Sequence, residues 1–213
     1  AVDALDNDQR LGSAFAQAPS PEIDRALTGA EDLIAAGRIE DARQTLLRIL
    51  LAVPKDVRVP FLLAQCELND AIRTGEEKDF EKARAWLRKA DQIEPRYAPT
   101  AYLWGMIGLK TKDYRTAVNG FQEALRRGYQ PLVTRGNIAH ALFLLGEELA
   151  GPGEREPEPA IEVLEQARKR LEALKDDTRQ SRQVRDVFRA LWIRAQVNIA
   201  ALHQTAGNYP EAQ

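Results

Sequence analysis

The residues from Thr100 to Tyr129 limit what this chain can fold into more than any other stretch. They read TAYLWGMIGLKTKDYRTAVNGFQEALRRGY, two apolar runs at helical spacing that are separated by a polar turn at Lys112 and Asp113. The second run ends in two arginines and Gly128, and cations followed by glycine are typical of a helix C-terminus. Two antiparallel helices of about 30 residues in total cannot bury their own apolar faces. The stretch therefore predicts a helical hairpin packed between similar hairpins.

The composition is that of a folded, helix-rich protein. The chain has 213 residues, of which 44% are hydrophobic and 29% charged. Its formal net charge of −2 argues against a nucleic-acid partner, because surfaces that bind nucleic acid are basic. No apolar run approaches the roughly 18 residues of a membrane span, so we expect no membrane insertion. A single cysteine, Cys66, excludes a disulfide within the chain and leaves both cytoplasmic and periplasmic locations open.

Further helical runs flank the hairpin on both sides. We expect helices from Pro21 to a turn at Gly37, over 39–53, from about 57 to a loop at 74–79, over 80–93, from Pro131 to about 149, over 160–175, and from about 183 to a break at Gly207. The Gly- and Pro-rich segment 150–159 predicts a solvated loop, and 176–182 a polar joint. Residues 1–20 are expected to form a tail, or alternatively a leader helix that caps the first repeat or lies in its groove.

An alanine opens the second helix of each expected hairpin, and the residues around it recur in register. The alanines are Ala42, Ala83, Ala117, Ala160 and Ala212, at gaps of 41, 34, 43 and 52 residues. Three residues before them stand Ile39, Phe80, Tyr114 and Tyr209, and four residues after them stand Leu46, Leu87, Phe121 and Leu164. Small residues let two helix backbones approach closely, and one large residue per helix fills the space beside them.

This registered pattern resembles the tetratricopeptide repeat family over about residues 22–213. The resemblance implies an all-α fold, a right-handed superhelical solenoid of antiparallel helix pairs with about four and a half repeats. The repeats are expected at 22–56, 57–96, 97–130, 131–176 and a truncated 182–213, within a repeat domain of residues 21–213. The fourth repeat departs most from the pattern, since Pro157 stands where the others carry an aromatic residue or isoleucine. We expect that the natural protein continues beyond Gln213, or that its last helices have been trimmed.

The sequence contains no recognisable catalytic, cofactor or metal motif. His140 and His203 are 63 residues apart, and each lies on an expected first helix as an ordinary helix-face residue. Cys66 has no CxxC partner and is expected to be a small buried residue. Residues 108–111 superficially resemble a phosphate-binding loop, but they lack a glycine directly before the lysine and lie within a helix. We therefore expect a protein that is not an enzyme and needs neither cofactor nor metal.

The resemblance implies that the first helices of successive repeats line a concave groove that binds peptides. Carried over by register, the groove residues are Arg58, Phe61, Gln65, Asn69, Tyr102, Met106, Lys110, Asn137, His140, Phe143, Arg194 and Asn198, beside Leu27, Glu31, Ile34, Leu109 and Gln204. Phe61 and Tyr102 stand where family members that clamp a C-terminal carboxylate would carry lysine, so binding of a chaperone tail is disfavoured. For Phe61 and Phe143 the alternative is packing between repeats.

The function predicted from these features is that of a protein-interaction scaffold. It would bind a peptide or protein partner in the groove, in bacterial complex assembly or regulation. The alternative is the binding arm of a larger enzyme or of a transport or maturation machine, such as those of glycosyltransferases or cytochrome c maturation. In either case, self-association through an exposed end of the stack is a further expectation.

Overall fold

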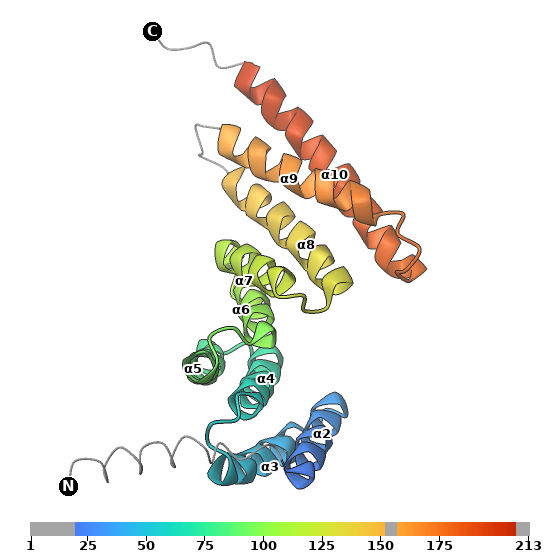
Figure 1. Cartoon of the computed structure of the whole chain (residues 1–213). Helices are drawn as coiled ribbons and strands as arrows, with labels where there is room; N and C mark the ends of the chain where they lie inside the picture. Colours follow the sequence, from blue (N-terminus) through green and yellow to red (C-terminus); the bar gives the residue numbers. More distant parts are fainter. Residues whose placement is uncertain (1–19, 152–156, 208–213) are drawn as a thin grey trace, which may run out of the picture. The chain divides into compact units, whose positions relative to one another are not determined.

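The computed structural model describes residues 20–151 and 157–207, which form nine α-helices and no strand (Figure 1). The chain is therefore an all-α helical repeat, as the sequence predicts. It divides into two compact units, residues 1–93 and 94–213, and each is described by itself. The expected tail or leader helix at the N-terminus lies outside the described residues, as do Tyr209 and Ala212 of the last expected helix.

Unit 1 consists of two helical hairpins. Its helices are α2 (Pro21–Ala35), α3 (Ile39–Ala52), α4 (Arg58–Thr74) and α5 (Glu77–Ile93). Helix α2 pairs with α3, α3 packs against α4, and α4 pairs with α5. Helix α2 starts at Pro21 as the sequence predicts, and its start is capped, because the Ser20 hydroxyl accepts a hydrogen bond from the Ile23 amide at 3.3 Å.

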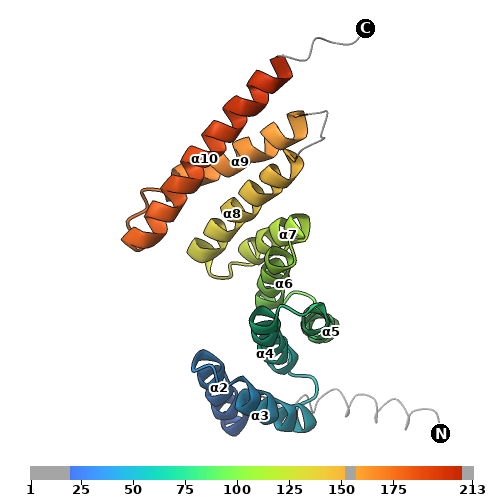
Figure 2. The same cartoon turned by 180° about the vertical axis from the view of Figure 1, so that it is seen from behind.

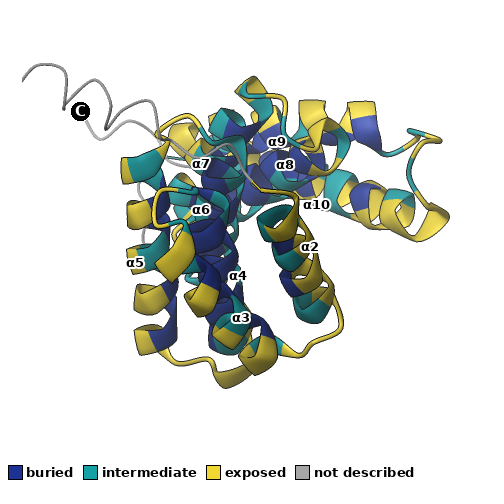
Figure 3. Ribbon diagram, turned by 60° about the horizontal axis from the view of Figure 1, so that its bottom comes forward, coloured by how far each residue is buried: buried dark blue, intermediate teal, exposed yellow. Residues whose placement is uncertain are grey.

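Helix α4 is the most deeply buried helix of unit 1. Residues 59–64 are all buried, and Cys66 is fully buried, as the sequence predicts (Figure 3). Burial raises the pKa of the Cys66 thiol to about 11, so the thiol is protonated at neutral pH. An ionic contact joins α4 to α3, since Arg43 Nε donates to Glu67 Oε1 at 3.0 Å and the same guanidinium also pairs with Asp70.

The described residues of unit 2 form a continuous stack of five helices. They are α6 (Ala98–Lys110), α7 (Tyr114–Arg126), α8 (Pro131–Leu149), α9 (Glu158–Leu174) and α10 (Arg182–Gly207). Each helix packs on the next, and α10 also contacts α8 (Figure 2). The backbones of α6 and α7 come very close, because a Cβ placed on Gly120 would lie 2.5 Å from the Gly105 amide nitrogen. Phe121 is fully buried beside this contact, which explains the alternation of small and large residues in the sequence.

Helix α5 starts earlier than the sequence predicts, at Glu77 rather than Phe80. The reason lies in Asp79, which the sequence assigns to a loop. Its carboxylate accepts a hydrogen bond from the Thr74 hydroxyl at 3.0 Å and from Lys82 Nζ at 2.8 Å. Acidic residues in a first turn also favour helix formation. The connection between α4 and α5 is therefore shorter than the expected loop at 74–79.

Candidate functional site

In unit 1, most predicted groove residues lie on α4, whereas Leu27, Glu31 and Ile34 lie on α2, where Leu27 is buried. Arg58 of α4 joins the two helices. Arg58 Nη1 donates to Asp24 Oδ1 of α2 at 2.7 Å, and Arg58 Nη2 donates to Asp56 Oδ2 at 2.6 Å. Burial alone would raise the pKa of Asp56, but hydrogen bonds from Arg58 hold that pKa below its usual value. Gln65 is half-buried, and Asn69 is exposed with its amide bonded to the Gln65 carbonyl at 2.9 Å.

In unit 2, buried threonines fix the starts of the two helices that carry most of the predicted residues. The Thr100 hydroxyl in α6 donates to the Tyr97 carbonyl at 2.7 Å, and the Thr134 hydroxyl in α8 donates to the Tyr129 carbonyl at the same distance. Both threonines are fully buried. Each bond ties the first turn of its helix to the segment before it, so the helices start in equivalent ways.

The structure brings Tyr102 of α6 and Asn137 of α8 into contact. Asn137 Nδ2 donates to the Tyr102 hydroxyl oxygen at 2.9 Å, and the Tyr102 ring lies 5.3 Å from the Phe121 ring and 5.2 Å from that of Tyr129. Burial raises the pKa of Tyr102, so its hydroxyl stays neutral at physiological pH. Met106 is half-buried one turn further along α6. The ring therefore packs against two other aromatic rings, and its hydroxyl is hydrogen-bonded between two first helices.

A second contact joins α8 to α10 around Glu147, which is absent from the residues predicted from sequence. Arg194 Nη2 donates to Glu147 Oε1 at 2.6 Å, and Asn198 Nδ2 donates to the same oxygen at 3.3 Å. The Arg194 guanidinium also lies 5.0 Å from the centre of the Phe143 ring. Phe143 is fully buried and Phe61 is only 7% exposed. Both phenylalanines therefore pack in the core and do not line an open groove.

His140 lies on α8 between these two contacts. Burial lowers the pKa of its imidazole, nearby Lys110 lowers it further, and Glu147 opposes the shift. The imidazole is therefore neutral at pH 7. We call the accessible residues of α6, α8 and α10 described above the first-helix face of unit 2. They are Tyr102, Met106, Lys110, Asn137, His140, Glu147, Arg194 and Asn198. The residues of this face supply neutral amides, a phenol, an imidazole, a thioether and a few charges.

The register that selected Asn137 and His140 also predicts Glu147 if it is followed further along α8. The accessible stripe of the helix runs through Leu144 and Glu147, whereas Phe143 points into the core. Sequence spacing therefore contained the signal for Glu147. It contained no signal for the ion pair itself, because Arg194 is 47 residues away.

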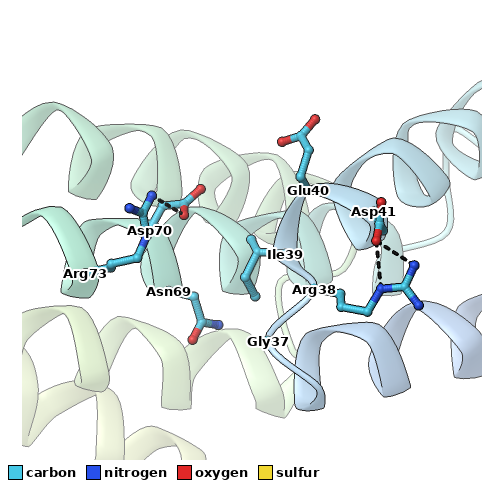
Figure 4. A pocket seen from close by; sticks show the side chains of 8 residues that line it. All are labelled: Gly37, Arg38, Ile39, Glu40, Asp41, Asn69, Asp70 and Arg73. Atoms are coloured by element: carbon cyan, nitrogen blue, oxygen red, sulfur yellow. Dashed lines mark hydrogen bonds and ion pairs between the residues drawn. The ribbon is translucent and has the colours of Figure 1, made fainter.

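A separate shallow cleft of about 490 Å³ lies in unit 1, between the turn that joins α2 to α3 and the C-terminal half of α4 (Figure 4). Its charged residues are paired within the chain, since Arg38 contacts Asp41 at 2.7 Å and Arg73 contacts Asp70 at 3.1 Å. Asn69 is the only predicted groove residue that lines this cleft. The cleft therefore does not coincide with the predicted peptide site.

The described part of the chain contains neither a membrane-spanning helix nor a metal-binding cluster. None of its helices is both long and apolar enough to cross a lipid bilayer. Within the same residues, no three His, Cys, Asp or Glu side chains gather as a metal site would require.

Comparisons with known proteins rest on structure. No protein-family model matches the chain, and no curated protein matches its sequence. TTC0263, a thermophilic TPR protein of Thermus thermophilus, aligns over 87% of both chains with a TM-score of 0.60 and 14% identity. The yeast histone chaperone Hif1, a scaffold protein that recruits protein complexes to core histones, aligns over 85% of this chain and 95% of its own with a TM-score of 0.62 and 16% identity. At these identities the likeness establishes the fold alone.

Proposed function

We propose that this chain, which has the fold of tetratricopeptide repeat proteins, is a non-catalytic scaffold that binds a protein partner through the first helices of its repeats. The role would be in complex assembly or regulation, in a bacterium. The fold supports protein partners in general, and Hif1 is one scaffold protein with the same fold. The finer proposal, that a peptide segment of the partner lies along the first-helix face of unit 2, rests on the residues of that face.

The observation that carries the proposal is the run of contacts across α6, α8 and α10. Tyr102 bonds to Asn137, and Glu147 bonds to both Arg194 and Asn198, so three successive first helices present polar groups on one connected face. The same face includes the half-buried apolar side chain of Met106, one helical turn from Tyr102. Rigid aromatic and apolar anchors beside hydrogen-bonding groups are typical of surfaces that bind extended segments.

Arg194 is an accessible charge of this face, with a side chain that is 60% exposed. Its contacts with the Phe143 ring and with Glu147 restrain the guanidinium, and a restrained group loses less entropy when a partner binds. Phe61 and Phe143 are excluded from the proposed contact surface because they are buried. Replacing either with alanine would measure core packing and not partner binding.

The experiment compares two double variants in affinity capture and then in direct titration. The face variant is Met106→Ala with Arg194→Ala, which removes one half-buried apolar and one exposed cationic side chain. The matched control is Ile161→Ala with Arg126→Ala, which makes the same kinds of change on the second helices α9 and α7. Circular dichroism checks that both variants keep their helical content.

We expect the face variant to weaken binding of the captured partner about tenfold or more, since truncation of a single anchor costs on the order of 1 kcal/mol or above. The control variant should bind within about twofold of the unmodified chain. Fluorescence anisotropy with peptides from the partner gives both dissociation constants. Equal affinities for the two variants would refute the assignment of the binding face.

A further inference from the structure

Helix α10 is apolar on two sides, whereas one apolar side is enough to pack it in unit 2. Its inner side carries Phe188, Ala195 and Ile199, which are buried against the rest of the unit. Its outer side carries Ile193 and Val197, which are 55% and 61% exposed. A helix with apolar residues on opposite sides is normally covered on both. The described residues leave this outer side uncovered.

The spacing of the outer side is that of a helix-pairing seam. Its residues are Asp186, Ala190, Ile193, Val197, Ala200 and Gln204, and all six are exposed. Successive members are alternately four and three residues apart, which is the heptad spacing of helices that pair along their length. The order is polar, small, large, large, small, polar. Small residues outside a large pair let two helices approach closely.

We propose that this seam binds the same seam of a second copy of the chain, with the two α10 helices antiparallel and a two-fold axis near residue 195. This pairing sets Ile193 of one copy against Val197 of the other. It sets Ala190 against Ala200, and Asp186 against the amide of Gln204. A two-fold interface requires a self-complementary surface of this kind, in which each contact between two residues occurs twice, once on either side of the axis.

The charges of α10 decide between the two directions of pairing. All of its charged residues lie between Arg182 and Arg194, and residues 195–207 carry none. Parallel pairing would set each of these charges beside its own copy, and four of the five are arginines. Antiparallel pairing sets the charged half of one helix against the uncharged half of the other. Arg194 is the one charged residue that this pairing leaves near its own copy, because it flanks the midpoint of the seam. Its charge is already paired with Glu147 at 2.6 Å, which reduces the repulsion.

The six seam residues are distinct from those of the first-helix face of unit 2, although Arg194 of that face flanks the proposed axis. Its test is the molar mass in solution, measured by light scattering and sedimentation over a wide range of protein concentration. We expect a reversible dimer for the unmodified chain. A monomer at every concentration would overturn the proposal and leave the seam to a different chain.

One variant and a matched control locate the interface. Val197→Asp places a carboxylate in the seam of both copies and should raise the dimer dissociation constant by about 100-fold or more. Val133→Asp makes the same change at a valine that is 52% exposed on α8, and it should leave the dimer intact. A dimer that tolerates Val197→Asp would overturn the proposal.

Cysteine cross-linking tests the direction and does not depend on how Val197→Asp folds. A mixture of Ala190→Cys and Ala200→Cys chains should form disulfide-linked heterodimers under mild oxidation, because the two positions face each other across the axis. Neither variant alone should cross-link, and Cys66 is buried and should give no background. Cross-linking of Ala190→Cys with itself, or none in the mixture, would contradict the antiparallel pairing.

Discussion

Substitution of Gly120 by alanine tests the closest helix contact in unit 2. A Cβ at this position would lie 2.5 Å from the Gly105 nitrogen, 2.8 Å from the Ala101 carbonyl oxygen and 2.9 Å from the Gly105 Cα. All three are backbone atoms of α6, so no side-chain rotation can relieve the overlap. Ordinary contacts of this kind begin at 3.4 Å, and α6 must therefore move away from α7 by close to 1 Å.

The magnitude follows from two opposing effects. Overpacking of a close contact costs about 1–3 kcal/mol, and a backbone clash in a rigid helix pair belongs at the upper end of that range. Alanine in place of glycine inside a helix gives back about 1 kcal/mol. We therefore expect Gly120→Ala to lower the free energy of unfolding by about 2 kcal/mol, because the cost of about 3 kcal/mol exceeds the gain.

Urea unfolding followed by circular dichroism measures this change, and two controls frame it. Gly29 lies in α2, and a Cβ added there would have no atom within 4 Å, so Gly29→Ala should raise stability by about 1 kcal/mol. Asn119→Ala alters the exposed neighbour of Gly120 and should change stability by no more than about 0.5 kcal/mol. If Gly120→Ala stabilised the protein as Gly29→Ala does, the close approach of α6 and α7 would be refuted.

Three other predictions concern stability and reactivity. Arg43→Ala should lower the free energy of unfolding by about 3 kcal/mol, measured in urea, because it leaves the buried Glu67 without its cation. Arg38→Ala, at an exposed ion pair, should lower it by no more than about 0.5 kcal/mol. Equal losses for the two variants would contradict the ionic contact. The folded state lowers the pKa of His140, so the unfolded chain binds a proton there more tightly, and stability should fall as the pH drops below 6.5. Thermal melts at several pH values should show this dependence of stability on pH, and His140→Gln should remove it. An unchanged pH dependence in the variant would be evidence against the pKa shift. At pH 8, Cys66 of the folded protein should react with a thiol reagent at less than about 1% of the rate of free cysteine, because the thiolate is the reactive form and the buried thiol stays protonated. A rate near that of free cysteine would show an accessible thiol.

The helices could be read from the sequence because their signals are local. Ser20 and Pro21 mark the start of α2, and Gly37 and Gly75 end helices with positive φ. The start of α5 was misplaced because the contact between Thr74 and Asp79 depends on three-dimensional geometry. The division into two units also has no local signal, because it depends on how much each helix buries against the others.

The candidate site was less predictable than the helices. Register placed Tyr102, Asn137 and Arg194 on first helices. The structure adds the hydrogen bond between Tyr102 and Asn137 and the ion pair between Arg194 and Glu147. Register could not tell that Phe143 points inward, because one residue of helical rotation separates the accessible stripe from the core. The claim that these residues contact a partner stays a prediction until a complex is measured.

The most direct test of the central claim is hydrogen–deuterium exchange of the full chain with and without its captured partner. Binding along the first helices should slow amide exchange in α6, α8 and α10 of unit 2, and leave α7 and α9 close to their free rates. Slowed exchange confined to α7 and α9, or no change in any helix of unit 2 at a saturating partner concentration, would contradict the account.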